Sequence, residues 1–148
     1  MSIAQILYEG VEIKGHGTIG LITYMRTDSV RISEEAQEKA KGFIEESYGK
    51  QYLPENVRVY KSKKNIQDAH EAIRPTYMDI TPEVAKENLT SEQYKLYSLI
   101  WKRFIASQMA SCILNTNSIE ILNGDYKFKA SGSIVDFDGF MKIYEYTN

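Results

Sequence analysis

The sequence contains very little cysteine, and it lacks both a long apolar run and a secretory signal. Its single cysteine, Cys112, cannot form an intramolecular disulfide or complete a zinc site. No apolar stretch approaches the roughly 20 residues that a membrane-spanning helix needs. The first ten residues have neither the cationic start nor the apolar segment of a signal peptide. We therefore expect a cytoplasmic protein without a membrane span, in a reducing environment.

A basic excess is also missing, because the formal net charge is −2 and the sequence pI is about 5.7. Proteins that bind nucleic acids usually carry a net positive charge or at least a basic face, so composition alone argues mildly against DNA binding. The 43% of hydrophobic and 26% of charged residues are typical of a globular protein. The 148 residues are close to the usual size of one domain. Eleven tyrosines are the one compositional excess.

Periodicity and capping signals predict helices over most of the first 110 residues. A helix over residues 2–13 is expected to end at the glycines around His16, and residues 18–28 are expected to be extended. Ser33 is a predicted N-cap of a helix that runs to Tyr48 and stops at Gly49. A short helix is expected over residues 82–88, and a capping box formed by Thr90 predicts a longer helix after it. The expected buried stripe of that last helix consists of Tyr94, Tyr97, Ile100, Trp101, Phe104, Ile105 and Gln108.

The pattern changes after Cys112. Alternating segments at residues 118–122 and 126–130 flank Asn123 and Gly124, a strong hairpin signal, and residues 140–146 predict a third strand. The predicted fold class is therefore α+β, with a mainly helical domain over residues 1–110 and a partial antiparallel β domain over residues 111–148. Residues 50–80 lack periodicity and predict a long irregular connection. Its basic cluster either contacts phosphates or is simply solvated: Arg58, Lys61, Lys63 and Lys64.

The segment GLITYMRTDS, residues 20–29, is the most informative stretch, and we name it the tyrosine motif. In an extended chain, Tyr24, Arg26 and Asp28 would share one face. A phenol becomes a useful nucleophile toward phosphorus when a guanidinium stabilises the developing charge. Spacing alone equally allows a structural interpretation, in which Tyr24 packs in a strand and Arg26 pairs with Asp28.

The segment HEAIRPT, residues 70–76, is a second candidate, and we name it the histidine motif. His70 and Arg74 together would orient a phosphodiester and neutralise its charge. A helical turn would place His70 and Arg74, four residues apart, on one face, but Pro75 favours an extended Arg74, so such a turn would end there. The alternative is a solvated turn in which His70 pairs with Glu71. Neither histidine of the chain stands at a metal-ligand spacing, so no metal site is expected.

Together the two motifs closely resemble the signature stretches of type IA DNA topoisomerases of the bacterial topoisomerase I branch. Residues 1–9 resemble the helix that precedes the tyrosine motif in this family, and residues 94–104 resemble a later helix. Met25 favours the topoisomerase I branch over the topoisomerase III branch, and Glu71 with Arg74 favours it as well.

The resemblance implies relaxation of negatively supercoiled DNA by transient single-strand cleavage, without ATP. Tyr24 would be the nucleophile that holds a 5′-phosphotyrosine, and Arg26 would stabilise the scissile phosphate. Four further residues of the motifs would bind DNA: His70, Arg74, Thr27 and Asp28. Residues 1–110 would form most of the tyrosine-bearing domain, and residues 111–148 would be the first strands of a β hinge domain.

Family members are several times longer, and the acidic domain that binds Mg²⁺ has no counterpart in this sequence. The chain is therefore expected to be a fragment of a bacterial, nucleoid-associated enzyme, with its metal site and remaining domains elsewhere. It is expected to be inactive alone. The alternative is a catalytically silent module that only binds DNA or packs against other helices.

Overall fold

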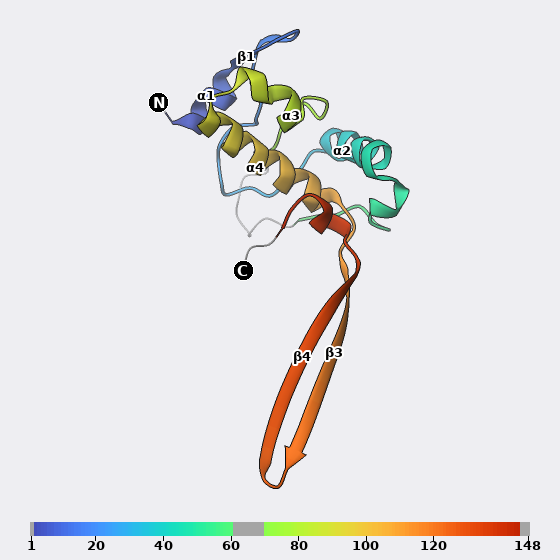
Figure 1. Ribbon diagram of the computed structural model, residues 1–148. Coiled ribbons are helices and arrows are strands. Elements are labelled where there is room, and N and C mark those ends of the chain that lie inside the picture. The colour runs from blue at the N-terminus through green and yellow to red at the C-terminus, as the bar shows by residue number, and fades with distance from the viewer. Residues whose placement is uncertain (1, 61–69, 146–148) are drawn as a thin grey trace.

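The computed structural model describes residues 2–60 and 70–145. Within these residues the chain forms four α-helices and two antiparallel hairpins, which confirms the predicted α+β class (Figure 1). Three of the four lysines and arginines in the predicted basic cluster, at positions 61, 63 and 64, lie outside the described residues. The elements are α1 (Ile3–Glu9), β1 (Val11–Ile13), β2 (Gly17–Ile19), α2 (Glu34–Tyr48), α3 (Pro82–Ala85), α4 (Ser91–Gln108), β3 (Ile113–Asn123) and β4 (Tyr126–Phe137).

The first helix is shorter than predicted, because the chain turns into a hairpin at Gly10. Gly10 has φ 140°, a conformation that ends α1, and β1 then pairs with β2 in the register Val11 to Ile19. The glycines around His16 form the turn of this hairpin and do not cap a helix. The prediction failed because Val11 and Ile13 are both buried, so a period of two replaces the apparent helical spacing.

The capping predictions for the other helices are confirmed. The hydroxyl of Ser33 accepts from the Ala36 N–H at the start of α2, and Gly49 ends that helix with φ 102°. Pro82 opens α3, which continues as a 3-10 turn (Lys86–Asn88). Both hydrogen bonds of the Thr90 capping box are present at the start of α4.

Helix α4 forms one wall of the core and carries most of the predicted stripe. Tyr97, Trp101, Phe104 and Ile105 are buried, whereas Tyr94 and Ile100 are half-buried. They pack with residues from α1, β1, α2 and the extended segment after β2, namely Leu7, Val11, Ile13, Leu21, Ile22, Ala40 and Ile44. The first residues of the tyrosine motif therefore belong to the core. No helix in the described part of the chain is long and apolar enough to cross a bilayer.

The second hairpin projects away from the helices (Figure 1), and its strands are longer than predicted. Asn123 pairs with Tyr126 across a turn in which Gly124 has φ 60°. Register places Ile121 opposite Phe128 on one face of the ribbon. The other face carries an ion pair of 2.9 Å between Lys127 Nζ and Glu120 Oε2.

The predicted third strand is wrong over its described residues, which begin with a 3-10 turn (Gly139–Lys142). Phe140 and Ile143, three residues apart, both pack against the core, and this spacing suits a turn better than a strand. The Phe140 N–H donates to the Ala110 carbonyl over 2.9 Å. Gly139 has φ 50° and lies so close to residues 110 and 111 that a Cβ there would be 2.5 Å from the Ser111 carbonyl oxygen.

We expect Gly20→Ala to destabilise the fold by about 1–3 kcal/mol, because the new Cβ would collide with the Tyr8 carbonyl oxygen at the end of α1. The matched control is Gly42→Ala on the exposed face of α2, where no atom lies within 4 Å of the added Cβ. That change should stabilise the helix by about 0.5–1 kcal/mol. Thermal denaturation of both variants checks the prediction, and equal effects would contradict it.

Candidate active site

The two motifs come together through their backbones although residues 30–69 separate them in the sequence. Ile22 and Pro75 form an antiparallel bridge. The Thr23 N–H donates to the Arg74 carbonyl over 2.9 Å, and the Thr76 N–H donates to the Leu21 carbonyl over 3.0 Å. The histidine motif is therefore extended, without the helical turn that would have placed His70 and Arg74 on one face.

Tyr24 lies at the surface immediately after this pairing. Its side chain is 52% exposed, and its ring packs edge-on against Tyr8 with centroids 5.4 Å apart. The His70 ring also lies near Tyr24, with 6.5 Å between the two ring centroids. Tyr8 was not among the residues chosen from the sequence, because nothing in its spacing links the end of α1 to residue 24.

The hydroxyl of Tyr24 differs from those of the structural tyrosines. Buried Tyr97 donates its hydroxyl to the Ile80 carbonyl, and Tyr60 donates to the Ser107 carbonyl over 2.6 Å. Within residues 2–60 and 70–145, no hydrogen-bond partner is found for the Tyr24 hydroxyl. An exposed phenol without such a partner is free to meet a substrate.

Met25 separates two exposed side chains of the tyrosine motif, Tyr24 and Arg26. Met25 is half-buried and lines an apolar hollow of about 380 Å³ together with Ile22 and Ile73. The Arg26 N–H donates to the Tyr24 carbonyl over 2.9 Å, so the backbone turns at Met25 and leaves both neighbouring side chains open to solvent.

Arg26 and Asp28 form an ion pair beside Tyr24, with 2.7 Å between Arg26 Nε and Asp28 Oδ1. The hydrogen bond to Asp28 raises the pKa of the Arg26 guanidinium, and the Coulombic effect of Tyr24 adds to the rise. The same hydrogen bond lowers the pKa of Asp28, and the charge of His70 contributes to the lowering. The site therefore holds the Arg26 guanidinium near the Tyr24 phenol, and the Asp28 carboxylate is already bound to that guanidinium. Both side chains remain well exposed, so the pair is accessible to a competing anion.

Arg74 points into its own motif. Its Nε lies 2.7 Å from Glu71 Oε2, and its Nη1 donates to the Pro75 carbonyl over 3.0 Å. Burial alone would raise the pKa of Glu71, but Arg74, the Ser33 hydroxyl and the charge of Arg31 together lower it. The alternative interpretation, a solvated turn in which His70 pairs with Glu71, is wrong in that detail, because Glu71 pairs with Arg74. Sequence reasoning missed Arg31, which is near enough for its charge to affect Glu71.

Thr27 and His70 complete the set of predicted site residues. Thr27 is exposed in the bend between Arg26 and Asp28, and His70 is half-buried at the first described position of the histidine motif. The structure therefore gathers Tyr24, Arg26, Thr27, Asp28 and His70 at one place. Arg74 adjoins them through its backbone.

No group of three or more histidine, cysteine, aspartate or glutamate side chains among the described residues could hold a metal ion.

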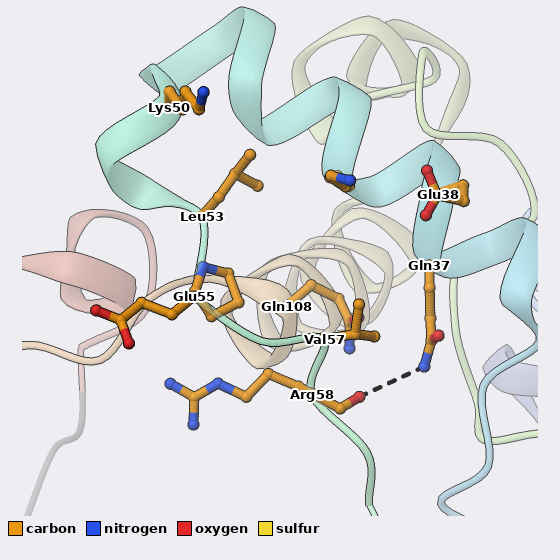
Figure 2. A pocket seen from close by; sticks show the side chains of 10 residues that line it. Gln37, Glu38, Lys50, Leu53, Glu55, Val57, Arg58 and Gln108 are labelled. Atoms are coloured by element: carbon orange, nitrogen blue, oxygen red, sulfur yellow. Dashed lines mark hydrogen bonds between the residues drawn. The ribbon is translucent and has the colours of Figure 1, made fainter.

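A separate hollow of about 350 Å³ lies between α2 and the segment after it (Figure 2). Gln37, Val57 and Arg58 line it, and the Gln37 side chain donates to the Arg58 carbonyl over 3.4 Å. Gln108 reaches it from α4. None of its lining residues belongs to either motif, so it is not part of the Tyr24 site.

Comparisons with known proteins identify a matching family and a similar solved structure. A family model described as DNA topoisomerase matches residues 1–148. The fold is similar to the structure of full-length topoisomerase I from Thermotoga maritima, with 43% sequence identity and a TM-score of 0.81. That match covers 99% of this chain and 23% of the Thermotoga chain, so this chain spans less than a quarter of that relative's length.

We expect Glu71→Gln to destabilise the protein by about 1–3 kcal/mol at neutral pH, because it removes a carboxylate that Arg74 stabilises. The pKa of Glu71 is lowered in the fold from its ordinary value of 4.5, so its stabilising effect is present above that pH and is lost as pH falls further. The melting-temperature gap between wild type and variant should therefore shrink between about pH 7 and about pH 3.5. Exposed Glu46→Gln is the control, and a gap that is constant with pH would contradict the prediction.

Proposed function

Because this chain belongs to the bacterial type IA family of DNA topoisomerases, we propose that it supplies the nucleophile for single-strand DNA cleavage and religation. One observation carries the proposal: Tyr24 is an exposed tyrosine between Arg26 and His70, and buried backbone pairing holds it in place. The substrate would be single-stranded or negatively supercoiled DNA, and the outcome would be relaxation by the longer protein.

In the proposed reaction, the Tyr24 hydroxyl gives up its proton to solvent, and its oxygen attacks the phosphorus of a phosphodiester and forms a phosphotyrosine. The bond from phosphorus to the 3′ oxygen breaks, and that oxygen takes up a proton and leaves as a 3′-hydroxyl. The DNA on the other side of the break stays attached to the protein through its 5′ phosphate. Religation reverses these steps. The exchange of one phosphodiester for another conserves the bond, so no ATP is required.

Arg26 would stabilise the negative charge on the phosphoryl oxygens during attack. In the free protein its Nε binds Asp28, so the phosphate would compete with the Asp28 carboxylate for the guanidinium. Asp28 thus holds Arg26 beside Tyr24 before DNA arrives. The pair is exposed, so exchanging one anionic partner for another costs little desolvation.

His70 and Thr27 would contact DNA next to the scissile phosphate, because both lie beside Tyr24 at the surface. Arg74 would act mainly by keeping the histidine motif extended, since its guanidinium already binds Glu71 and the Pro75 carbonyl. Any contact of Arg74 with DNA would use its remaining donors.

We further propose the division into a tyrosine-bearing domain over residues 1–110 and the first strands of a hinge domain over residues 111–148. Mg²⁺ and the other partners of the reaction would come from the remaining domains of a longer, cytoplasmic, nucleoid-associated enzyme. The chain alone would not relax DNA, because Tyr24 and its neighbours form only one side of a phosphate site.

We expect Tyr24→Phe to abolish the covalent DNA adduct in a full-length topoisomerase that carries this segment, because the variant lacks the attacking oxygen. Denaturing gels with a single-stranded oligonucleotide measure the adduct. A label on the 3′ side of the break should stay with the protein, and a label on the 5′ side should appear in a free fragment. Tyr126→Phe, at the exposed tip of the second hairpin, is the matched control and should form the adduct normally. No adduct in the wild type would favour a catalytically silent module.

We expect Arg26→Ala to slow cleavage more than Arg26→Lys does, because lysine keeps the charge but loses the planar fork of donors. The loss for Arg26→Ala should be about 100-fold or more in the cleavage rate constant, similar to the removal of one transition-state donor. Single-turnover cleavage with saturating oligonucleotide measures it. Equal rates for wild type and both variants would exclude Arg26 from the reaction.

A further inference from the structure

Thr23 joins the two motifs with its side chain as well as its backbone. Its hydroxyl donates to the Ala72 carbonyl over 2.8 Å and accepts from the Arg74 N–H over 2.9 Å. Its own N–H donates to the Arg74 carbonyl over 2.9 Å. Three hydrogen bonds therefore fix the residue immediately before Tyr24, and its β-branched side chain has few alternative rotamers.

Ser29 makes the corresponding link on the other side of Tyr24. It is 6% exposed, and its hydroxyl donates to the His70 carbonyl over 2.7 Å. The same oxygen accepts from the Arg31 N–H over 3.3 Å, and the Ala72 N–H donates to the Arg31 carbonyl over 2.7 Å. The loop that carries Tyr24, Arg26 and Asp28 is thus tied to the histidine motif at both of its ends.

We propose that Thr23 and Ser29 are positioning residues, whose hydroxyls hold the Tyr24 loop against His70 in the geometry needed for attack on phosphorus. This inference rests on the proposed function of Tyr24. Between the two ties, residues 24–28 are well exposed or half-buried; Met25 reaches the apolar hollow, and the Tyr24 ring contacts Tyr8. The position of the phenol therefore depends on the ties, and neither hydroxyl needs to touch DNA.

The role follows from the sensitivity of catalysis to geometry. A misplacement of the reacting group by about 1 Å can cost roughly 100-fold in rate. Removing the Thr23 hydroxyl also leaves the Ala72 carbonyl and the Arg74 N–H without their present partner, which favours a shift of the loop.

The test compares Thr23→Val, Thr23→Ser and Ser29→Ala in a full-length topoisomerase that carries this segment. Thr116→Val is the control. It also removes a hydrogen-bonded threonine hydroxyl, which in this case pairs with the Ser133 hydroxyl on the exposed hairpin. Single-turnover cleavage at saturating oligonucleotide gives the rate constant, and titration with the same oligonucleotide gives the dissociation constant. Rates are divided by the folded fraction, measured by circular dichroism well below the melting temperature.

We expect Thr23→Val to lower the cleavage rate constant by about 10- to 100-fold, with a dissociation constant within about threefold of wild type. Thr23→Ser should restore most of the rate because it keeps the hydroxyl, and Ser29→Ala should lower it by about 10-fold. Thr116→Val should be unchanged. If Thr23→Val fails to fold, Ser29→Ala decides by the same criterion.

Rate losses that vanish after correction for the folded fraction would overturn the positioning role, as would a loss confined to DNA affinity. Tyr24→Phe is run in parallel to separate the two proposals. An adduct in that variant would refute the proposed nucleophile, whereas its absence together with wild-type rates in Thr23→Val and Ser29→Ala would refute only the positioning role.

Discussion

Leu21 and Ile22 are buried, and the backbone around them is hydrogen-bonded on both sides. The Leu21 N–H donates to the Leu7 carbonyl over 2.8 Å, while its carbonyl accepts from the Thr76 N–H. Leu21 and Ile22 therefore fix where the chain leaves the core, and Tyr24 lies two residues after Ile22. The close approach of Gly20 to α1 belongs to the same arrangement. The position of exposed Tyr24, the proposed nucleophile, thus depends on buried apolar residues of the core.

The contrast between Tyr24 and Tyr97 illustrates how one residue type takes two roles. Tyr97 is fully buried, and burial raises the pKa of its phenol, which favours the neutral form that hydrogen-bonds to Ile80. Tyr24 is exposed, with the Arg26 guanidinium nearby and two aromatic neighbours, Tyr8 and His70. Tyr97 contributes its buried ring and a hydrogen bond to the core. Tyr24 makes fewer contacts and is accessible from solvent.

Local sequence signals predicted the parts of the fold that depend on local physics. The caps at Ser33 and Thr90 define α2 and α4 because side-chain hydroxyls there satisfy nearby N–H groups. Predictions failed where distant contacts decide, as at Val11, whose partner is Ile19, and at Phe140, which binds the Ala110 carbonyl. At the site, residue spacing suggested the shared face of Tyr24 and Arg26. The meeting of the two motifs followed only from family resemblance, since no local rule pairs Ile22 with Pro75.

The root of the second hairpin has a mechanical consequence. At that point the Ala110 N–H donates to the Tyr52 carbonyl, and the Tyr52 hydroxyl donates to Asp138 over 2.7 Å. Arg58 also binds the Ser111 hydroxyl over 2.6 Å. Eleven residues of strand β3 span about 36 Å, so a tilt of about 10° at the root displaces the tip by about 6 Å. The ribbon is therefore a lever arm, and a force applied at its tip acts as a torque on the helices that hold Tyr24.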